Sequence, residues 1–269
     1  MSILLTFIFG AIIGSFLNVV IYRYNSGRKL SGRSGCGVCS KTLAWYELIP
    51  VFSFFALEGK CMKCKTKISW QYPLVEFITG LVFASVYIKF GYVFPMETMS
   101  LMLYAWIIFA LLMVIAVYDI RHKIIPDGMV YFFILFAFIS MFFGLSENAI
   151  IIPSFWSILA GPILALPFFL LWLVSKGKWI GLGDAKLSLG IGFLFGITKG
   201  LAVLLLSFWI GAIVGVLLIL ISNIFSLFNG KKRITLKTEI PFAPFMILGV
   251  FIVFIFGLDI YSITSLFSF

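Results

Sequence analysis

Two aspartates of this sequence stand at the ends of apolar segments. Asp119 closes one segment, and Asp184 opens another directly after Gly181-Leu182-Gly183. An ionisable group at the edge of hydrocarbon is costly, so each of the two needs a reason to be there. Two carboxylates at the same depth can share a proton and activate a water molecule between them, as the aspartic proteases do. The sequence therefore predicts a catalytic dyad of Asp119 and Asp184.

Each aspartate taken alone also has a structural interpretation. Asp184 could cap the N-terminus of a helix, which aspartate does well. Asp119 could be an interfacial charge that pairs with Arg121 or Lys123. The combination of the two favours the dyad, and the two glycines before Asp184 would let a peptide backbone approach it closely.

Further residues are expected to support the site. Asp127 follows Pro126, which breaks the chain, and capping of the next helix is the preferred interpretation of its carboxylate. Glu76 lies one turn into an apolar segment, where it could offset the helix dipole or line a cavity. His122 is the only histidine, and no serine or cysteine nucleophile with a base is apparent. The expected supporting residues are Gly181, Gly183, Lys186, Asp127 and Glu76.

All four cysteines lie in one polar stretch as two Cys-x-x-Cys motifs, Cys36 with Cys39 and Cys61 with Cys64. Four thiolates at this spacing can surround one Zn²⁺ tetrahedrally. Four protein ligands leave no open position for a substrate, so the metal is expected to stabilise the fold and to do no chemistry. Two disulfides, or reduced thiols without a metal, are the alternatives, and disulfides would need an oxidising compartment.

The composition of the chain indicates an integral membrane protein. Of 269 residues, 62% are hydrophobic and 11% are charged, which is too little polar surface to cover a soluble domain. A net charge of +10 could indicate a nucleic-acid partner, but the bases lie in a few short connections between apolar segments. That placement is the positive-inside pattern of membrane proteins, so lipid is the expected surrounding and no nucleic acid is expected.

Eight apolar segments are predicted to cross the bilayer. With the N-terminus outside, the connections 23–71, 119–127, 175–184 and 228–241 fall in the cytoplasm and hold, in or beside them, 18 of the 20 Lys and Arg residues. The dyad then lies at the cytoplasmic face, and both termini are external. The first segment has no basic start and no cleavage site, so it is expected to be retained. The segments are 3–22, 72–90, 99–118, 128–145, 153–174, 185–197, 200–227 and 242–258, of which the sixth is short and glycine-rich.

The predicted fold is therefore an all-α polytopic membrane protein with a small zinc-ribbon-like loop domain in the cytoplasm. Its parts are a first transmembrane helix (1–22), a tetra-cysteine loop domain (23–71) and a multi-span peptidase domain (72–269).

The motifs together resemble the bacterial type IV prepilin peptidases, the bifunctional leader peptidase/N-methyltransferases whose aspartyl site is of the GxGD type. The resemblance covers nearly the whole chain, and one small departure is Ala243, where the family commonly has glycine. The stretches that carry it are 14–23 (GSFLNVVIYR), the two Cys-x-x-Cys motifs with 45–50 (WYELIP) between them, 72–76 (YPLVE), Asp119 with 125–127 (IPD), 181–186 (GLGDAK) and 240–245 (IPFAPF).

The resemblance implies an aspartic endopeptidase of the bacterial inner membrane. Its substrates would be prepilins or pseudopilins, with a short basic leader in the cytoplasm and an apolar helix in the membrane, cut after a glycine and usually before a phenylalanine. Members of the family often then methylate the new N-terminus with S-adenosylmethionine. No glycine-rich dinucleotide-type fingerprint is visible in the loop, so methyl transfer rests on the resemblance alone, and it should need residues 23–71.

Three other classes remain as alternatives. A presenilin-like or signal-peptide-peptidase-like protease would use the same aspartates, but no Pro-Ala-Leu motif occurs near the C-terminus and the cysteines would be unexplained. A cation-coupled transporter could bind its ion through the same pair, but the inverted halves expected of one are not visible. A membrane subunit with a purely structural zinc loop is the third.

Overall fold

A computed structural model describes residues 2–27, 29, 32–90, 96–143, 152–229 and 240–265. They form nine α-helices and one short 3-10 helix, and none of these described residues lies in a β-strand. The all-α prediction is therefore confirmed. The chain divides into two compact units, unit 1 (Met1–Val117) and unit 2 (Tyr118–Phe269).

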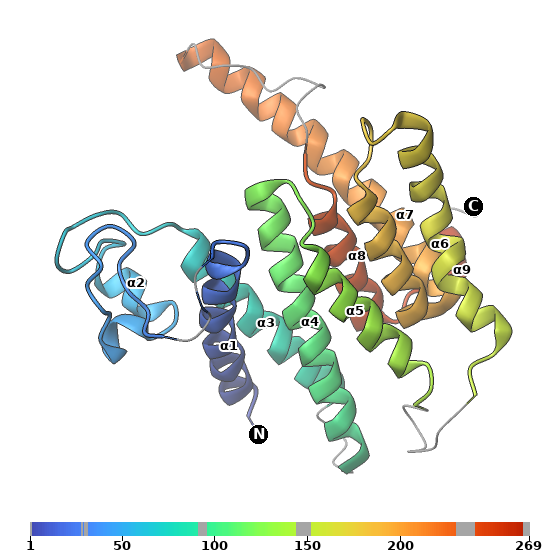
Figure 1. The fold of residues 1–269 in the computed structure, drawn as a ribbon, viewed down its shortest axis with the longest axis horizontal. Coiled ribbons are helices and arrows are strands. Elements are labelled where there is room, and N and C mark those ends of the chain that lie inside the picture. The colour runs from blue at the N-terminus through green and yellow to red at the C-terminus, as the bar shows by residue number, and fades with distance from the viewer. Residues whose placement is uncertain are drawn as a thin grey trace. The chain divides into compact units, whose positions relative to one another are not determined.

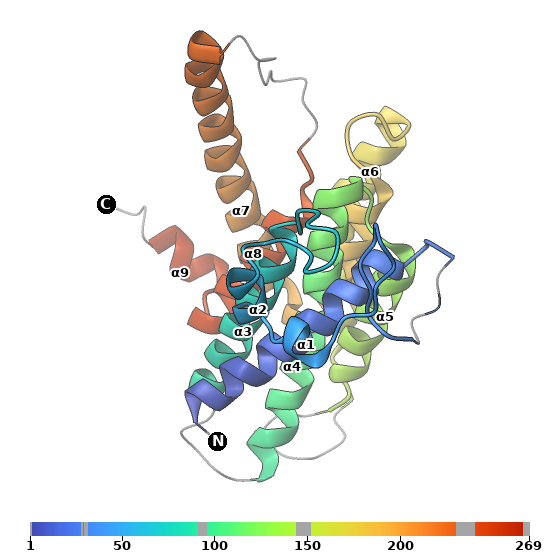
Figure 2. The same ribbon diagram turned by 90° about the vertical axis from the view of Figure 1, so that its left-hand side faces the viewer.

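Two of the long helices of unit 1 are joined by a small polar region (Figures 1 and 2). These two helices are α1 (Ile3–Arg23) and α3 (Gln71–Phe90), which lie side by side. The region between them holds two short helices, η1 (Trp45–Leu48) and α2 (Phe52–Ala56). It is the part that the sequence predicts to be the cysteine loop.

Small residues and aromatic rings hold the long helices of unit 1 together. A Cβ on Gly14 of α1 would lie 2.8 Å from the Cα of Glu76 on α3, so glycine is what allows this close approach. The helix α4 (Met96–His122) joins them through Trp106. The Trp106 ring stacks on Phe83 with 5.0 Å between the centroids, and its indole N–H donates to the Phe83 carbonyl at 3.2 Å.

Unit 2 is built around the long helix α7 (Leu182–Asn229). Three helices pack on it: α5 (Asp127–Ser140), α6 (Phe155–Ser175) and α8 (Ala243–Phe256). The short α9 (Ile260–Ser265) adds a smaller contact.

The helix α7 consists of two helical segments that meet at Gly196. This residue has φ 72° and ψ −171°, a conformation that essentially only glycine adopts. A Cβ on Gly200 would lie 3.9 Å from the Cα of Gly192, whereas residues eight apart in a straight helix are separated by about 12 Å. The chain therefore turns back here, as the gold and orange parts of α7 show in Figure 1. The two parts correspond to the predicted segments 185–197 and 200–227.

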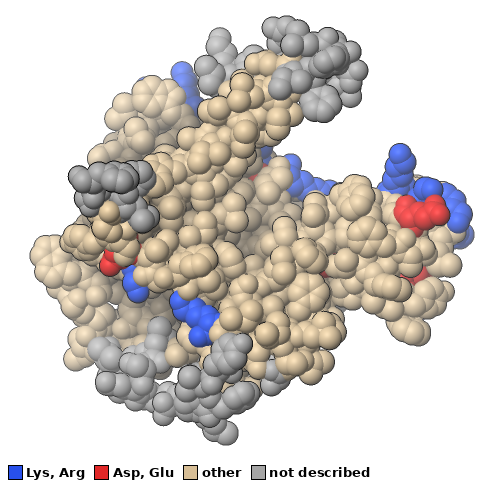
Figure 3. Space-filling model, turned by 180° about the vertical axis from the view of Figure 1, so that it is seen from behind, with Lys and Arg blue, Asp and Glu red and all other residues tan. Residues whose placement is uncertain are grey.

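Five helices are long and apolar enough to cross a membrane by length and composition. The shorter apolar helices α5 and α8 lie where the fourth and eighth segments are predicted; with 14 residues each, they are about 21 Å long. The face seen in Figure 3 is mostly uncharged, as expected of helices in lipid. The number of spans and their sidedness stay predictions. The five helices are Ile3–Arg23, Gln71–Phe90, Met99–His122, Phe155–Ser175 and Leu182–Asn223.

The closest approach of α6 and α7 makes a testable prediction. A Cβ on Gly192 would lie 2.5 Å from the carbonyl oxygen of Ala160, and backbone atoms cannot give way without moving a helix. We expect Gly192→Ala to destabilise the protein by about 1–3 kcal/mol, measured as a lower thermal unfolding temperature in detergent. Gly215→Ala is the matched control, because a Cβ there meets only the side chain of Ile240 at 3.9 Å. Equal stability of the two variants would contradict the close packing.

Candidate functional site

Asp119 lies in the last turn of α4 and is 5% exposed. Its carboxylate accepts a hydrogen bond from the backbone N–H of Ala243, the first residue of α8. The N–H groups at a helix start have no partner within the helix, so they are suited to a carboxylate. A group far along the chain therefore binds Asp119, and the sequence analysis did not single it out as part of the site.

Asp184 is the third residue of α7 and is half-buried. Its carboxylate accepts a hydrogen bond from the N–H of Gly181, which lies just before the helix. This bond is one half of a capping box. The alternative that Asp184 caps the start of a helix therefore describes part of its bonding. The charge of Asp119 also acts on Asp184, which places the two carboxylates in one electrostatic environment within unit 2.

The two glycines of the Gly-x-Gly stretch have different surroundings. A Cβ on Gly183 would lie 2.7 Å from the Cβ of Ile125, so this glycine lets the segment after α4 pack against the start of α7. Gly181 is exposed, and a Cβ there would meet the Asp184 carboxylate only at an ordinary 3.9 Å. Gly183 therefore serves packing between the two aspartyl motifs. Room for a substrate backbone stays a prediction for Gly181.

Lys186 links the same two segments by charge. Its Nζ lies 2.6 Å from the Asp127 carboxylate and 4.9 Å from the centre of the Tyr131 ring. Asp127 is the first residue of α5, whose N-cap is Pro126 and carries no side-chain cap. The prediction that Asp127 caps this helix is wrong, because an ion pair with a residue distant in sequence takes its carboxylate. Tyr131 was not predicted, although its place one turn after Asp127 could have indicated it.

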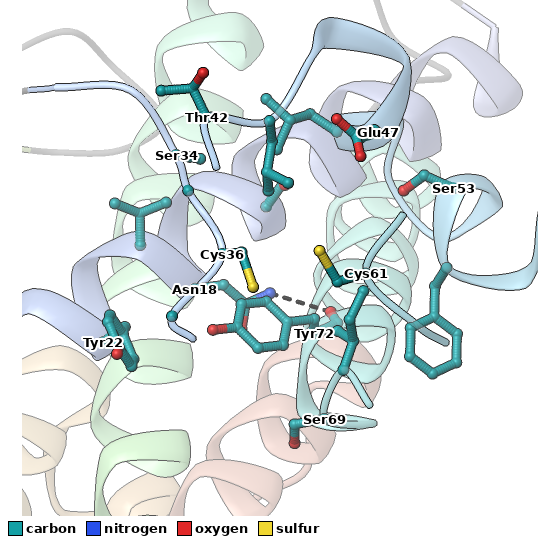
Figure 4. Close-up of a pocket in the computed structure, with 18 of the residues that line it drawn as sticks. Asn18, Tyr22, Ser34, Cys36, Thr42, Glu47, Ser53, Cys61, Ser69 and Tyr72 are labelled. Atoms are coloured by element: carbon teal, nitrogen blue, oxygen red, sulfur yellow. Dashed lines mark hydrogen bonds between the residues drawn. The ribbon is translucent and has the colours of Figure 1, made fainter. Parts of the chain in front are cut away.

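The four cysteines lie together in unit 1, on either side of η1 and α2. Their Sγ atoms are all within 4.8 Å of one another, and the Sγ atoms of Cys36 and Cys64 are 3.7 Å apart. A tetrahedral site with metal–sulfur bonds of about 2.3 Å has edges of about 3.8 Å. Figure 4 draws two of these side chains, Cys36 and Cys61. The cluster can therefore hold a metal ion with little rearrangement.

The two Cys-x-x-Cys motifs fold in the same way. The N–H of Cys36 donates to the Lys41 carbonyl and the N–H of Cys61 to the Thr66 carbonyl, each at 2.9 Å. The residues after the second cysteines, Ser40 and Lys65, both have positive φ, of 55° and 58°. Each motif is thus a tight turn closed five residues on, which holds its two sulfurs on one side.

Two of the thiols have environments that favour the thiolate. The backbone N–H groups of Cys39 and Val38 lower the pKa of Cys36 below its ordinary value. The hydroxyl of Thr66, 3.2 Å from the sulfur, and then the backbone of Thr66 lower the pKa of Cys64 to about 6. Because the thiolate is the form that binds metal, Cys36 and Cys64 are the two thiols best prepared for a cation. At Cys39 the Lys41 backbone lowers the pKa, but burial and the neighbouring thiols outweigh it and raise the pKa to about 11.

Glu47 fastens the first cysteine motif to η1, and the sequence analysis did not identify it. Its carboxylate accepts from the N–H of Ala44 at 2.9 Å and from Nζ of Lys41 at 3.0 Å, and its side chain is 1% exposed. The Ala44 N–H, followed by the Lys41 ammonium, lowers the pKa of Glu47 below its ordinary value. The spacing Lys41–Glu47 crosses a turn, which no helical or strand periodicity would reveal.

Comparison with known proteins gives two family matches. Residues 8–90 match the bacterial peptidase A24 N-terminal domain, and residues 106–216 match the type IV leader peptidase family. No solved structure gives a significant match.

Several curated proteins are similar over most of the chain, and each is named prepilin leader peptidase/N-methyltransferase. The one from Bacillus subtilis (strain 168) is 32% identical over 95% of both chains. The one from Myxococcus xanthus (strain DK1622) is 34% identical over 80% of this chain and 62% of its own. The one from Pseudomonas aeruginosa is 29% identical over 95% of this chain and 90% of its own.

The bonding of Glu47 predicts a pH-dependent contribution to the stability of the loop. The pKa of Glu47 is lower in the folded state than in the unfolded state, where it is about 4.3. The stabilisation is therefore complete above the unfolded-state pKa and is lost as the pH falls through the folded-state pKa. We expect Glu47→Gln to cost about 1–3 kcal/mol at pH 7 and progressively less below pH 4, measured by thermal unfolding. Glu58→Gln, at an exposed pair with Lys60, should change little at either pH. A Glu47→Gln deficit that does not shrink in acid would contradict this.

Proposed function

This chain belongs to the type IV leader peptidase family, and from that premise we propose that it removes the leader of prepilins or pseudopilins with Asp119 and Asp184 as the catalytic carboxylates. The chain is an integral protein of a bacterial membrane. The observation that supports the catalytic pair is that two acids from separate helix ends interact within one unit, with one of them buried. A structural ion pair joins opposite charges, so it gives no reason to place two carboxyl groups near one another, whereas a catalytic pair does.

The chemistry would be that of an aspartic protease. One carboxylate takes a proton from a water molecule, which attacks the scissile carbonyl, while the other carboxyl group donates its proton to the carbonyl oxygen. When the resulting gem-diol collapses, the first group passes the proton it took from water to the leaving amine, and the second group takes a proton back from a gem-diol hydroxyl. The backbone N–H groups of Ala243 and Gly181 orient the two carboxylates. Lys186, Asp127 and Gly183 hold the segments that carry them, and Gly181 gives the substrate access.

The substrate would be a membrane helix with a short basic leader, cut after a glycine and before a phenylalanine. In this proposal the dyad and the cysteine loop face the cytoplasm, both termini are external, and the membrane is the bacterial inner membrane. The bases of the connections support this sidedness, although 230–239 of the last cytoplasmic connection lie outside the described residues.

The cysteine loop would hold one structural Zn²⁺ through Cys36, Cys39, Cys61 and Cys64. The sulfur spacing fits the metal, and four thiolates from the protein leave it no position for a substrate. A metal of this kind orders a segment too small to have a core of its own. The functional division would be the first helix (1–22), the zinc loop (23–71) and the peptidase region (72–269).

The names of the relatives support a second reaction, N-methylation of the amine that cleavage releases. S-adenosylmethionine would supply the electrophilic methyl group. The part of this chain that matches the N-terminal family domain, residues 8–90, would carry that reaction, and Glu76 lies within it. The intramembrane-protease and transporter alternatives lose support, because neither explains the match to this domain.

The dyad is tested by cleavage of a synthetic prepilin with the detergent-purified chain. Asp119→Asn and Asp184→Asn should each lower the cleavage rate by at least about 10²–10⁴-fold, the contribution of one acid or base. Asp259→Asn is the control, because it makes the same change at a carboxylate that bonds Ser262 at the start of α9. Near-normal cleavage by either single variant would exclude this pair as the catalytic centre.

The metal is tested by elemental analysis of the purified chain. We expect about one zinc per chain, and loss of that zinc in Cys61→Ser. The variant should also lower the thermal stability of unit 1, because the loop loses its cross-link. A fully folded wild-type chain without any metal would remove this explanation of the cysteines.

A further inference from the structure

Unit 1 contains a cavity of about 640 Å³ that the peptidase chemistry does not use. Its walls are α1, the cysteine loop and the first turns of α3 (Figure 4). The residues that matter for its chemistry are Ser15, Asn18, Glu47, Tyr72 and Glu76, with a basic rim of Arg23, Lys29 and Arg33.

Asn18 gives the cavity an acceptor without a donor. The residue is 1% exposed, and its Nδ2 donates to the carbonyl of Tyr72 at 3.1 Å (Figure 4). Its Oδ1 is buried with no hydrogen-bond partner, and it is the one side-chain atom of that kind in the described parts of the chain. An unsatisfied buried acceptor is costly, so the Oδ1 of Asn18 needs a donor, which either a water molecule or a group of a ligand can supply.

Glu76, on α3, adds a carboxylate to another wall of the cavity. It is 8% exposed; its Oε2 accepts from the N–H of Val51 at 2.7 Å, and the Ser15 hydroxyl also donates to the carboxylate. These donors are neutral. The three ion pairs found within the described ranges do not include Glu76. A buried carboxyl group whose partners are all neutral is costly in its ionised form, so it is stabilised either by protonation or by a cation.

The loop keeps an unusual backbone conformation where it meets Glu76. Val51 has φ 62° and ψ −52°, and the N–H of Phe52 donates to the Pro50 carbonyl at 2.6 Å. This is a γ-turn of the rare, strained hand, at a β-branched residue. Strain of this kind persists where the surroundings enforce it, and it is concentrated at functional sites.

The two acceptors also lie at a depth that restricts the ligand. Asn18 is five residues before the end of α1 and Glu76 five residues after the start of α3, so each is about 8 Å inside its helix end. An ammonium group at the end of an apolar chain can reach this depth, because the Glu76 carboxylate would neutralise its charge there. The basic rim disfavours cations that approach from the loop side without a negative group of their own.

We propose that this cavity binds an alkylammonium group, with Glu76 supplying the negative charge and the Oδ1 of Asn18 accepting one ammonium hydrogen. Two molecules of the proposed function carry such a group, so the identity of the ligand rests on that function. One is the processed substrate, whose new N-terminus is a primary amine on an apolar helix. The other is S-adenosylmethionine, whose amino-acid end carries an ammonium next to a carboxylate. The depth of the acceptors favours the processed substrate.

The test is binding to the full detergent-purified chain, measured by titration calorimetry with no cleavage step. The probes are a synthetic apolar peptide with a free N-terminal phenylalanine and the same peptide N-acetylated. We expect the free amine to bind at least about tenfold tighter to the wild-type chain, and Glu76→Gln to abolish the difference. Asn18→Asp should strengthen binding of the free amine alone. Glu58→Gln, at the exposed pair with Lys60, is the matched control and should keep the wild-type ratio.

A second titration with S-adenosylmethionine separates the two sources of the ammonium. If Glu76→Gln weakens S-adenosylmethionine and leaves the peptide ratio unchanged, the site binds the ammonium of the methyl donor. If neither ligand responds to Glu76→Gln or Asn18→Asp, the acceptors are structural and the proposal is overturned. If Glu76→Gln does not fold, as judged by loss of bound metal, the tighter binding of the free-amine peptide expected for Asn18→Asp still tests the proposal. None of these binding measurements depends on Asp119 or Asp184, so failure of this proposal can be told apart from failure of the peptidase proposal.

Discussion

Holding carboxylates at the ends of apolar helices is the constraint on which unit 2 depends. A carboxyl group removed from bulk water needs hydrogen-bond donors that the protein supplies. The N–H groups of Ala243 and Gly181 supply them, and both lie at helix starts where such groups are free. The start of α8 therefore lies at the end of α4, whereas the bond from Gly181 to Asp184 is made within the start of α7 itself.

Close packing of small residues brings the elements of unit 2 together. Gly183 brings the segment after α4 against α7, and Gly192 brings α6 against α7 further along. In lipid there is little hydrophobic gain from joining two helices, so contact and polar bonds must hold them. The ion pair of Lys186 with Asp127 is one such bond, and it ties the two aspartyl motifs to each other.

How much of the fold and of the site could be predicted from the sequence depends on how far apart along the chain the interacting residues lie. Hydropathy located the helices, because the bilayer imposes length and apolarity on every span. The cysteine cluster followed from spacing, since a knuckle closes within a few residues. Local rules failed where a distant group competes: Asp127 bonds Lys186 instead of capping α5, and Ala243 reaches Asp119 across the sequence. The bonds of Glu47 and the free acceptor of Asn18 depend on how the loop folds over the helices, which no periodicity records.

The most direct test of the central claim is an experimental structure of the chain with a substrate-like peptide whose scissile carbonyl is replaced by a hydroxyl group. The dyad predicts that the hydroxyl oxygen lies about 2.6–3.2 Å from a carboxylate oxygen of Asp119 and from one of Asp184. A peptide bound away from these residues would contradict the account. So would carboxylate oxygens more than about 6 Å apart in the complex, because one water molecule could not bridge them.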